Sequence, residues 1–228
     1  MRLRTPPPSK QHARQVYLVD DHPMLRQGFT YVINLAPDLK VCGEADNGEI
    51  ALKAVAALKP DLVILEVGLR EGNGLDLIKR LKISHPQVPV LVLSIRDETV
   101  FAQRCLRAGA RGYVMKQAPT EEVMEAIRRV LQGGRYVSGR VQERMLENLS
   151  NGSEDGATPG IERLSDRELE VFRLVGQGCG TRQIAEQLQL SIKTIETYRA
   201  HIKEKLKLRS ATDLIRSAVK IASQEESF

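Results

Sequence analysis

The chain has 228 residues, of which 42% are hydrophobic and 28% are charged, and its net charge is +5. This length suits one large domain or two small ones, and the composition is that of a protein with hydrophobic cores and a charged surface. No apolar run approaches the ~20 residues that span a bilayer, and the first residues lack the apolar centre of a signal peptide, so the sequence argues against a membrane or secreted protein.

Periodic patterns occupy two parts of the chain, residues 14–130 and 157–222. Residues 1–13 include three successive prolines and predict a disordered extension. The stretch 148–160 lacks periodicity and is rich in Gly, Ser, Asn and Asp, so we expect a linker at 131–156. Residues 223–228 form a short tail. The sequence therefore predicts two domains joined by a linker.

The first part alternates strand and helix patterns. Short apolar runs rich in β-branched residues indicate five strands, at 15–20, 39–45, 61–67, 89–95 and 112–116. Helical patterns follow each of them, at 23–36, 47–59, 73–84, 98–109 and 120–134. This alternation predicts an α/β fold, a five-stranded doubly wound parallel sheet with helices on both faces.

Polar and charged side chains stand where four of these strands end. Asp20 and Asp21 end the first strand, Glu66 the third, Ser94 the fourth and Lys116 the fifth. The carboxyl ends of parallel strands share one edge, where ligands bind in such folds. Clustered carboxylates need a cation, and a hard ion such as Mg²⁺ prefers oxygen ligands. A hydroxyl and an ammonium opposite them could hold the oxygens of a phosphoryl group.

With these residues in place, the first domain resembles the receiver (response regulatory) domain of two-component response regulators. The resemblance is carried by "LVDDHPMLRQGF", "PDLVILEVGLREGNGLDLIKRLK", "VLVLSIRDE" and "AGARGYVMKQA". It implies a Mg²⁺ site formed by Asp20, Asp21, the carboxylate of residue 66 and the backbone carbonyl of Gly68. It also implies switch residues that sense or bind a phosphoryl group, namely Ser94, Tyr113 and Lys116.

Glu66 departs from this family pattern, because the phosphoacceptor position normally carries aspartate. Glutamate is one CH₂ longer, which moves its oxygens by ~1.5 Å and disturbs the in-line geometry of phosphoryl transfer. Its carboxylate could instead reach Ser94 and Lys116 as a partial phosphoryl mimic, with −1 charge in place of about −1.5 to −2. An inert scaffold and residual phosphotransfer are the alternatives. Arg70 replaces the proline usual in the next loop, and this second departure favours loss of the ordinary reaction.

The second part is helical throughout. Its patterns predict helices at 165–178, 181–188, 192–206 and 210–222, with Ser165 and Ser210 as N-caps and Glu168 completing a capping box. A short helix, a tight turn and a longer basic helix make a helix-turn-helix motif at about 181–200. The stretch "LSDRELEVFRLVGQG...IAEQLQLSIKTIETYRAHIKEKLKLRSATDLI" resembles the LuxR-type DNA-binding domain of NarL/FixJ regulators. This resemblance implies an all-α four-helix domain that binds duplex DNA.

The charge supports a nucleic-acid partner. Residues 14–133 carry 16 Lys/Arg against 15 Asp/Glu, whereas residues 191–209 carry six against two. At ~100° per residue, one face of the 192–206 helix is apolar and the opposite face is free for the major groove. We expect base contacts from Glu196, Thr197 and Ala200. The residues expected to contact phosphates are Thr181, Arg182, Lys193, Thr194, Tyr198, Arg199 and Lys203.

These observations predict a cytoplasmic, sequence-specific transcription regulator that binds double-stranded DNA as a homodimer. Its three widely spaced cysteines fit reduced thiols. An ordinary kinase-driven response regulator is the nearest alternative, and the partner sensor kinase stays open. A Mg²⁺-dependent phosphohydrolase would use the same acidic pocket, but the sequence offers no separate catalytic base. An RNA-binding domain could use the same basic segment, but the helix-turn-helix form favours duplex DNA.

Overall fold

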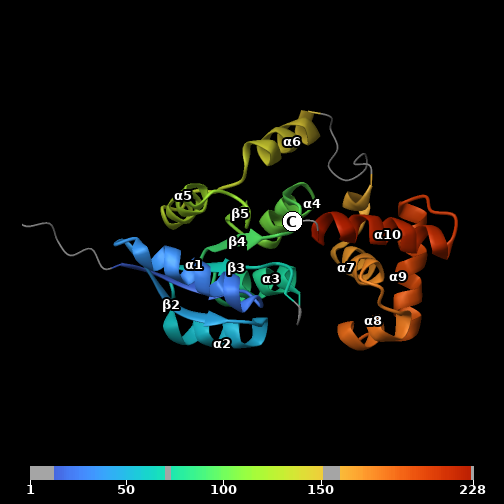
Figure 1. Ribbon diagram of the computed structural model, residues 1–228, viewed down its shortest axis with the longest axis horizontal. Coiled ribbons are helices and arrows are strands. Elements are labelled where there is room, and N and C mark those ends of the chain that lie inside the picture. The colour runs from blue at the N-terminus through green and yellow to red at the C-terminus, as the bar shows by residue number, and fades with distance from the viewer. Residues whose placement is uncertain (1–12, 70–72, 151–159, 227–228) are drawn as a thin grey trace, which may run out of the picture.

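A computed structural model describes residues 13–69, 73–150 and 160–226. Its first domain contains a fully parallel sheet with the strand order β2-β1-β3-β4-β5 (Figure 1). The strands are β1 Arg14–Val19, β2 Leu39–Ala45, β3 Leu62–Leu65, β4 Val90–Ser94 and β5 Gly112–Met115. The five strands predicted from apolar runs are therefore confirmed. The fully buried sequences of β3 and β4 reflect a sheet that is covered on both sides.

Helices cover the two faces of this sheet. They are α1 Pro23–Leu35, α2 Gly48–Leu58, α3 Gly74–Ser84, α4 Glu98–Ala108 and α5 Thr120–Leu131. Buried residues of α2, α3 and α4 pack against one face, and those of α1 and α5 pack against the other. Asn47, Asn73 and Asp97 cap the backbone N–H groups of α2, α3 and α4. The predicted doubly wound α/β fold is confirmed.

A helix that the sequence patterns did not predict lies inside the expected linker. It is α6 Gly139–Ser150, which packs against α4 and buries Val141. Part of the segment between the domains is therefore attached to the receiver-like domain. The predicted extension 1–13, apart from residue 13, and the linker stretch 151–159 lie outside the described residues, as does Arg70.

The second domain consists of the short 3₁₀ turn η1 Ile161–Arg163 and four helices, α7 Asp166–Gly176, α8 Thr181–Leu188, α9 Ile192–Lys205 and α10 Ala211–Glu226. Ser165 and Glu168 form the predicted capping box, and Ser210 accepts from the Asp213 amide as the predicted cap of α10. Glu168 is buried and lies 2.6 Å from Lys205 Nζ. Burial raises the pKa of Glu168, but the bonds from Lys205 and Ser165 outweigh it and lower the pKa overall. This contact ties α7 to α9.

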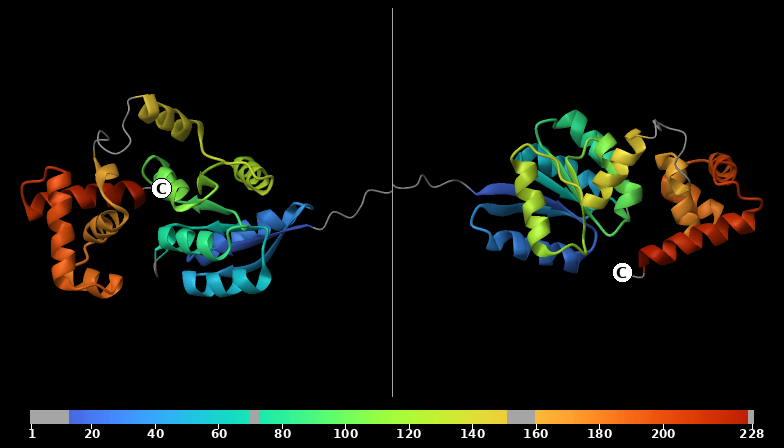
Figure 2. Two further views of the ribbon diagram at one scale, coloured as in Figure 1. Left: turned by 180° about the vertical axis from the view of Figure 1, so that it is seen from behind. Right: turned by 90° about the horizontal axis from the view of Figure 1, so that it is seen from above.

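The two domains contact each other through α7 and the receiver-like domain's α3 and α4. Figure 1 and the views from behind and above in Figure 2 place α9 on the side of the second domain away from the sheet. No helix among the described residues is long and apolar enough to cross a membrane.

Candidate functional site

The expected acidic pocket forms at the carboxyl edge of the sheet. Asp20, Glu66 and Ser94 are buried there, and the side chain of Lys116 is only 3% exposed. Backbone bonds between neighbouring strands, such as Glu66 N to Val19 O at 2.8 Å and Lys116 N to Ser94 O at 2.9 Å, fix the strand ends relative to one another. The topology thus brings together residues that lie far apart in the sequence.

The carboxylate of Glu66 contacts the residues that the resemblance assigns to phosphate recognition. Its Oε1 accepts from Ser94 Oγ at 2.5 Å and from the Gly68 amide at 2.6 Å. Its Oε2 lies 2.9 Å from Lys116 Nζ and accepts a long bond from the Ile95 amide at 3.4 Å. The glutamate therefore already contacts both the hydroxyl and the ammonium of the pocket.

Lys116 neutralises part of the pocket. Its Nζ also lies 2.6 Å from Asp20 Oδ2, and the directions of these contacts depart from ideal hydrogen bonds, so the attraction is mainly ionic. A buried ion pair of this kind strongly destabilises a fold when only one partner is removed. The positions of Asp20 and Glu66 are therefore coupled through one ammonium.

His22 occupies the outer side of the pocket. Its Nδ1 lies 3.2 Å from Asp20 Oδ1 and 2.9 Å from Asp21 Oδ1, and its backbone amide donates to Asp20 Oδ1 at 2.9 Å. Ligand atoms of Asp20, Asp21 and His22 lie close enough to hold one metal ion. The carboxylate oxygens suit a hard cation, whereas both oxygens of Glu66 already accept bonds from the protein.

Two glycines allow the pocket loop to approach its neighbours. A Cβ at Gly68 would lie 2.8 Å from Arg96 Nε and 3.1 Å from Glu66 Oε1. A Cβ at Gly74 would lie 2.5 Å from the backbone of Val67, which no side-chain movement could relieve. Gly74 therefore needs glycine because the loop after β3 packs its backbone directly against α3, whereas at Gly68 the flexible Arg96 side chain could move aside.

The predicted switch residue Tyr113 points inward. It is 1% exposed, and its hydroxyl donates to the backbone oxygen of Arg96 at 2.7 Å. Burial raises the pKa of Tyr113 well above its usual range, so the hydroxyl keeps its proton. Ser94 Oγ accepts from the Arg96 amide at 3.1 Å, which links Glu66, Ser94 and the start of α4 in one hydrogen-bonded series.

The face of α9 expected to meet DNA is open. Ile195 and Ile202 are fully buried, whereas Glu196, Thr197 and Ala200 are exposed in the two-domain chain. This burial agrees with the helical periodicity predicted from the sequence. Lys193 and Arg182 are also exposed, and the partly exposed members of the predicted set are Thr181, Thr194, Tyr198, Arg199 and Lys203.

Local contacts refine what these side chains can do. Thr197 donates its hydroxyl to Lys193 O at 3.0 Å, so its oxygen is left as an acceptor. Arg199 donates to Thr181 Oγ1 at 3.3 Å, which joins the start of α8 to α9. Ser191 and Thr194 share a hydrogen bond at 2.8 Å at the start of α9. The contact of Arg199 with Thr181 thus links two of the residues expected to contact phosphates, one on each helix of the motif.

Sequence reasoning did not single out several residues that shape the pocket. The sequence patterns gave His22 no role, yet its ring contacts both aspartates. Arg26 donates to the backbone oxygen of Asp20 and pairs with Glu44, and Arg96 packs over Gly68. The stretches "DDHP" and "SIRD" show that His22 and Arg96 are close in sequence to pocket residues. Neither stretch shows in which direction a long side chain points in the fold.

Two family models match the chain. The model described as the response regulator receiver domain matches residues 16–128. The model described as bacterial regulatory proteins of the luxR family matches residues 162–218. The matches fall on the two domains seen in the structure, one on each.

Individual relatives and solved structures resemble the chain over both domains. The oxygen regulatory protein NreC of Staphylococcus aureus (strain JH9) is 35% identical over 210 residues, which are 90% of this chain and 97% of the relative. The structure of RcsB from Salmonella enterica serovar Typhimurium, bound to promoter rprA in the presence of phosphomimetic BeF3-, is 26% identical with a TM-score of 0.69. The match covers 91% of this chain and 99% of RcsB. A second RcsB structure, from Salmonella typhimurium, has a TM-score of 0.72 at 25% identity, over 92% of this chain and 98% of that chain.

Proposed function

Because the chain belongs to the response regulators that join a receiver domain to a luxR-family regulatory domain, we propose that it is a DNA-binding transcription regulator whose receiver works without phosphorylation. The independence from phosphorylation is supported by the contact of Glu66 with Ser94 at 2.5 Å and with Lys116 at 2.9 Å. In this proposal Glu66 takes the place of a phosphoryl group toward the switch residues. The inward Tyr113 belongs to the same arrangement.

The glutamate acts by position and charge. Its carboxylate offers acceptors to the Ser94 hydroxyl and to the Lys116 ammonium, the same two donors that a phosphoryl group would engage. One negative charge provides less attraction than the ~1.5 to 2 charges of a phosphoryl group, so the receiver is biased rather than fully switched. A conventional kinase-driven receiver remains the competing account, and residual phosphotransfer at Glu66 would be its signature.

In this proposal the pocket binds Mg²⁺, but the receiver does not need the ion to keep its arrangement. Asp20 and Asp21 would hold the ion, together with the carbonyl of Gly68, and the ion would neutralise carboxylate charge. Lys116 already supplies one positive charge to Asp20 and Glu66. The chain's own residues therefore hold the arrangement in the absence of the ion.

The output is recognition of double-stranded DNA by α9. RcsB, the structural relative, is bound to a promoter, and the exposed face of α9 here carries the polar residues that major-groove reading needs. We propose a homodimer, because one small helix-turn-helix domain reads few base pairs and paired half-sites compensate. A regulator of promoters would work in the cytoplasm. The phosphohydrolase alternative loses support, since both domains match regulatory families.

Two substitutions on α9 separate reading of bases from binding of phosphates. Lys203→Ala should weaken binding to all duplexes alike, whereas Thr197→Ala should relax the preference at one base pair by about 1–3 kcal/mol. Binding would be measured by titrating labelled duplexes that carry the preferred site or single base changes. Thr212→Ala, which makes the same change at an exposed residue of α10, is the matched control. Equal effects of Thr197→Ala on all sequences would contradict the base-reading role.

A further inference from the structure

The start of α7 is the point where the second domain touches the receiver domain. Asp166, in the first turn of α7, lies 2.9 Å from Lys79 of α3 and 3.1 Å from Arg104 of α4. Partial burial raises the pKa of Asp166, but the bonds from Lys79 and Arg104 outweigh it and lower the pKa overall. A carboxylate at a helix N-terminus is also favoured by the helix dipole. Two helices of the receiver thus hold one carboxylate of the output domain.

Arg104 makes further contacts beyond this ion pair. Its Nη2 donates to the backbone oxygens of Leu164 at 2.6 Å, Glu162 at 3.0 Å and Ile161 at 3.4 Å. These carbonyls belong to η1 and the turn that follows it; that of Ile161 also accepts from the Leu164 amide at 3.1 Å, and the end of a short helix leaves later carbonyls available to such a donor. The side chain of Arg104 is only 13% exposed. A planar guanidinium can serve several acceptors at once, which an ammonium cannot do with the same geometry.

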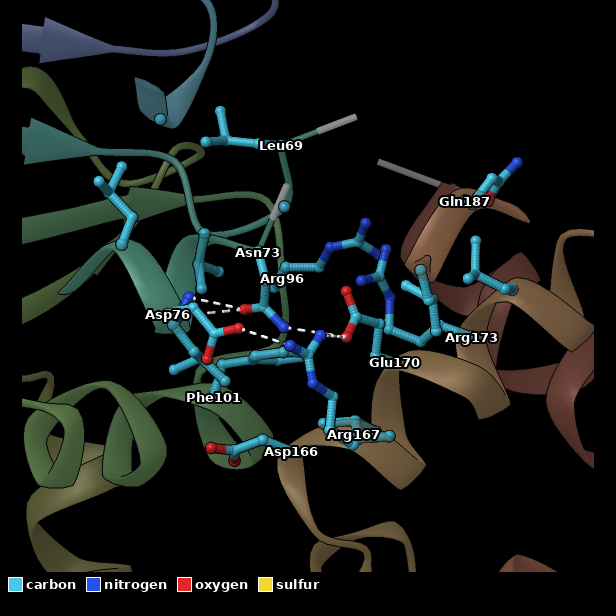
Figure 3. Close-up of a pocket in the computed structure, with 18 of the residues that line it drawn as sticks. Leu69, Asn73, Asp76, Arg96, Phe101, Asp166, Arg167, Glu170, Arg173 and Gln187 are labelled. Atoms are coloured by element: carbon cyan, nitrogen blue, oxygen red, sulfur yellow. Dashed lines mark hydrogen bonds and ion pairs between the residues drawn. The ribbon is translucent and has the colours of Figure 1, made fainter. Parts of the chain in front are cut away.

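A second group of contacts lies beside the first, around a cavity of about 780 Å³ between the domains. Figure 3 shows Asn73 bonded to Glu170, and Arg167 between Asp76 and Glu170. The Asn73 amide nitrogen lies 3.1 Å from Glu170, and Arg167 lies 2.9 Å from Asp76. Asn73 and Asp76 belong to the start of α3, which follows the pocket loop. The interface therefore joins α7 to the start of α3, directly after the pocket loop, and to α4.

This docking leaves the DNA-reading surface free. Glu196, Thr197 and Ala200 are exposed although the receiver is in contact with α7. Figures 1 and 2 place α9 beyond α7 from the receiver in each view. The receiver in this arrangement cannot block DNA by covering the recognition helix.

The pocket connects to Arg104 through a continuous set of contacts. Glu66 accepts from Ser94, Ser94 accepts from the Arg96 amide, and Tyr113 holds the Arg96 carbonyl. Asp97 then caps α4, on which Arg104 lies. The bonds from Glu66 to the backbone of Arg96 are buried, whereas the cap bond from the Thr99 amide to Asp97 at the start of α4 is exposed. Contiguity permits coupling between the two sites, and only a measured interaction energy establishes it.

We propose that Arg104 clamps η1 and α7 to the receiver, holds the output domain with its DNA-reading face outward, and is the residue through which the state of the Glu66 pocket affects DNA binding. The proposal rests on the proposed function for its last part, because DNA binding is its readout. Its first part is independent of DNA. Arg104 is thus a positioning residue for the output domain and contacts no nucleic acid.

The test uses the full-length protein and two readouts. Amide hydrogen exchange at residues 161–166 should become about tenfold faster in Arg104→Ala, because the clamped turn opens more often. Arg107→Ala removes the same charge from an exposed position of the same helix and should leave this exchange unchanged. Arg104→Lys should give an intermediate rate, since it keeps the pairing with Asp166 but not the fork that binds the carbonyls.

The second readout is a double-mutant cycle on DNA affinity with Glu66→Ala and Arg104→Ala. If the clamp couples the sites, Glu66→Ala should lose most of its effect in the Arg104→Ala background. An effect of the same size in both backgrounds would overturn the coupling, and unchanged exchange at 161–166 would overturn the clamp itself. If Glu66→Ala has no effect in the wild-type background, the mimic in the proposed function is wrong, while the exchange experiment still decides whether the clamp exists.

Discussion

Replacing Glu66 by alanine is expected to lower DNA affinity by ten- to a hundred-fold. The change removes the acceptor of Ser94 and leaves Lys116 beside Asp20. A charged hydrogen bond contributes roughly 1.5–3 kcal/mol, and this free energy is lost only by the receiver conformation that makes the contact. If the DNA-competent conformation makes it, the equilibrium shifts away from that state by the same amount. Titration of a labelled promoter duplex with full-length protein measures the effect.

Two companion variants make this prediction sharper. Glu66→Gln keeps the size of the side chain but removes its charge, so it should give a smaller loss through Lys116 alone. Glu125→Ala, at an exposed position of α5, controls for the loss of a negative charge from the receiver. Circular dichroism checks that each variant is folded. DNA affinity that does not change on Glu66→Ala would mean that the receiver is an inert scaffold and that the glutamate does not act as a mimic.

DNA affinity is also expected to fall by about 500-fold per bound monomer when the salt concentration rises fourfold, because ~5 neutralised phosphates per monomer give a slope near −4.5. The contributing surface includes Lys193 and Arg182, which are exposed, and Arg199 and Lys203, which are partly exposed. The affinity of the full-length protein for one duplex would be measured over this range of salt. Each lysine or arginine that binds a phosphate should reduce the slope by about 1 when it is replaced by alanine.

The residues away from this surface provide the control for the salt experiment. Arg128 pairs with Asp38 on the receiver, so Arg128→Ala should leave the slope unchanged. A flat salt response of the wild-type protein would contradict binding through the basic face of the helix-turn-helix motif.

The fold could be predicted from local sequence patterns because each of these strands and helices shows the hydrophobic periodicity of its own type. The apolar runs of β3 and β4 are buried on both sides, as expected for central parallel strands. The face of α9 could be predicted because Ile195 and Ile202 recur at helical spacing and are the residues that become buried. Helix α6 was missed although Val141 and Met145 recur at helical spacing and become buried and partly buried, respectively; only its packing against α4, a contact between distant segments, could not be predicted from the local pattern.

The sequence predicted which residues of the candidate site lie at the ends of strands. The order of Asp20, Glu66, Ser94 and Lys116 along the chain places them at one edge once the sheet is parallel. The roles of His22 and Arg104 were not predictable in this way. Each role depends on the direction in which the side chain points in the folded structure. Arg104 also binds backbone carbonyls of the other domain. Charge alone gave no reason to prefer it over the exposed Arg107 of the same helix.

The central claim is that Glu66, and not a phosphoryl group, holds the receiver in its DNA-competent arrangement. Its most direct test is the intact mass of the wild-type protein after incubation with a small phosphodonor and Mg²⁺, beside the double variant Glu66→Asp with Arg70→Pro as a chain in which the acceptor is restored. We predict that the wild-type mass does not change and that the double variant gains one phosphoryl group. A phosphoryl adduct on the wild-type protein would contradict the account, because the pocket would then still be driven by phosphorylation.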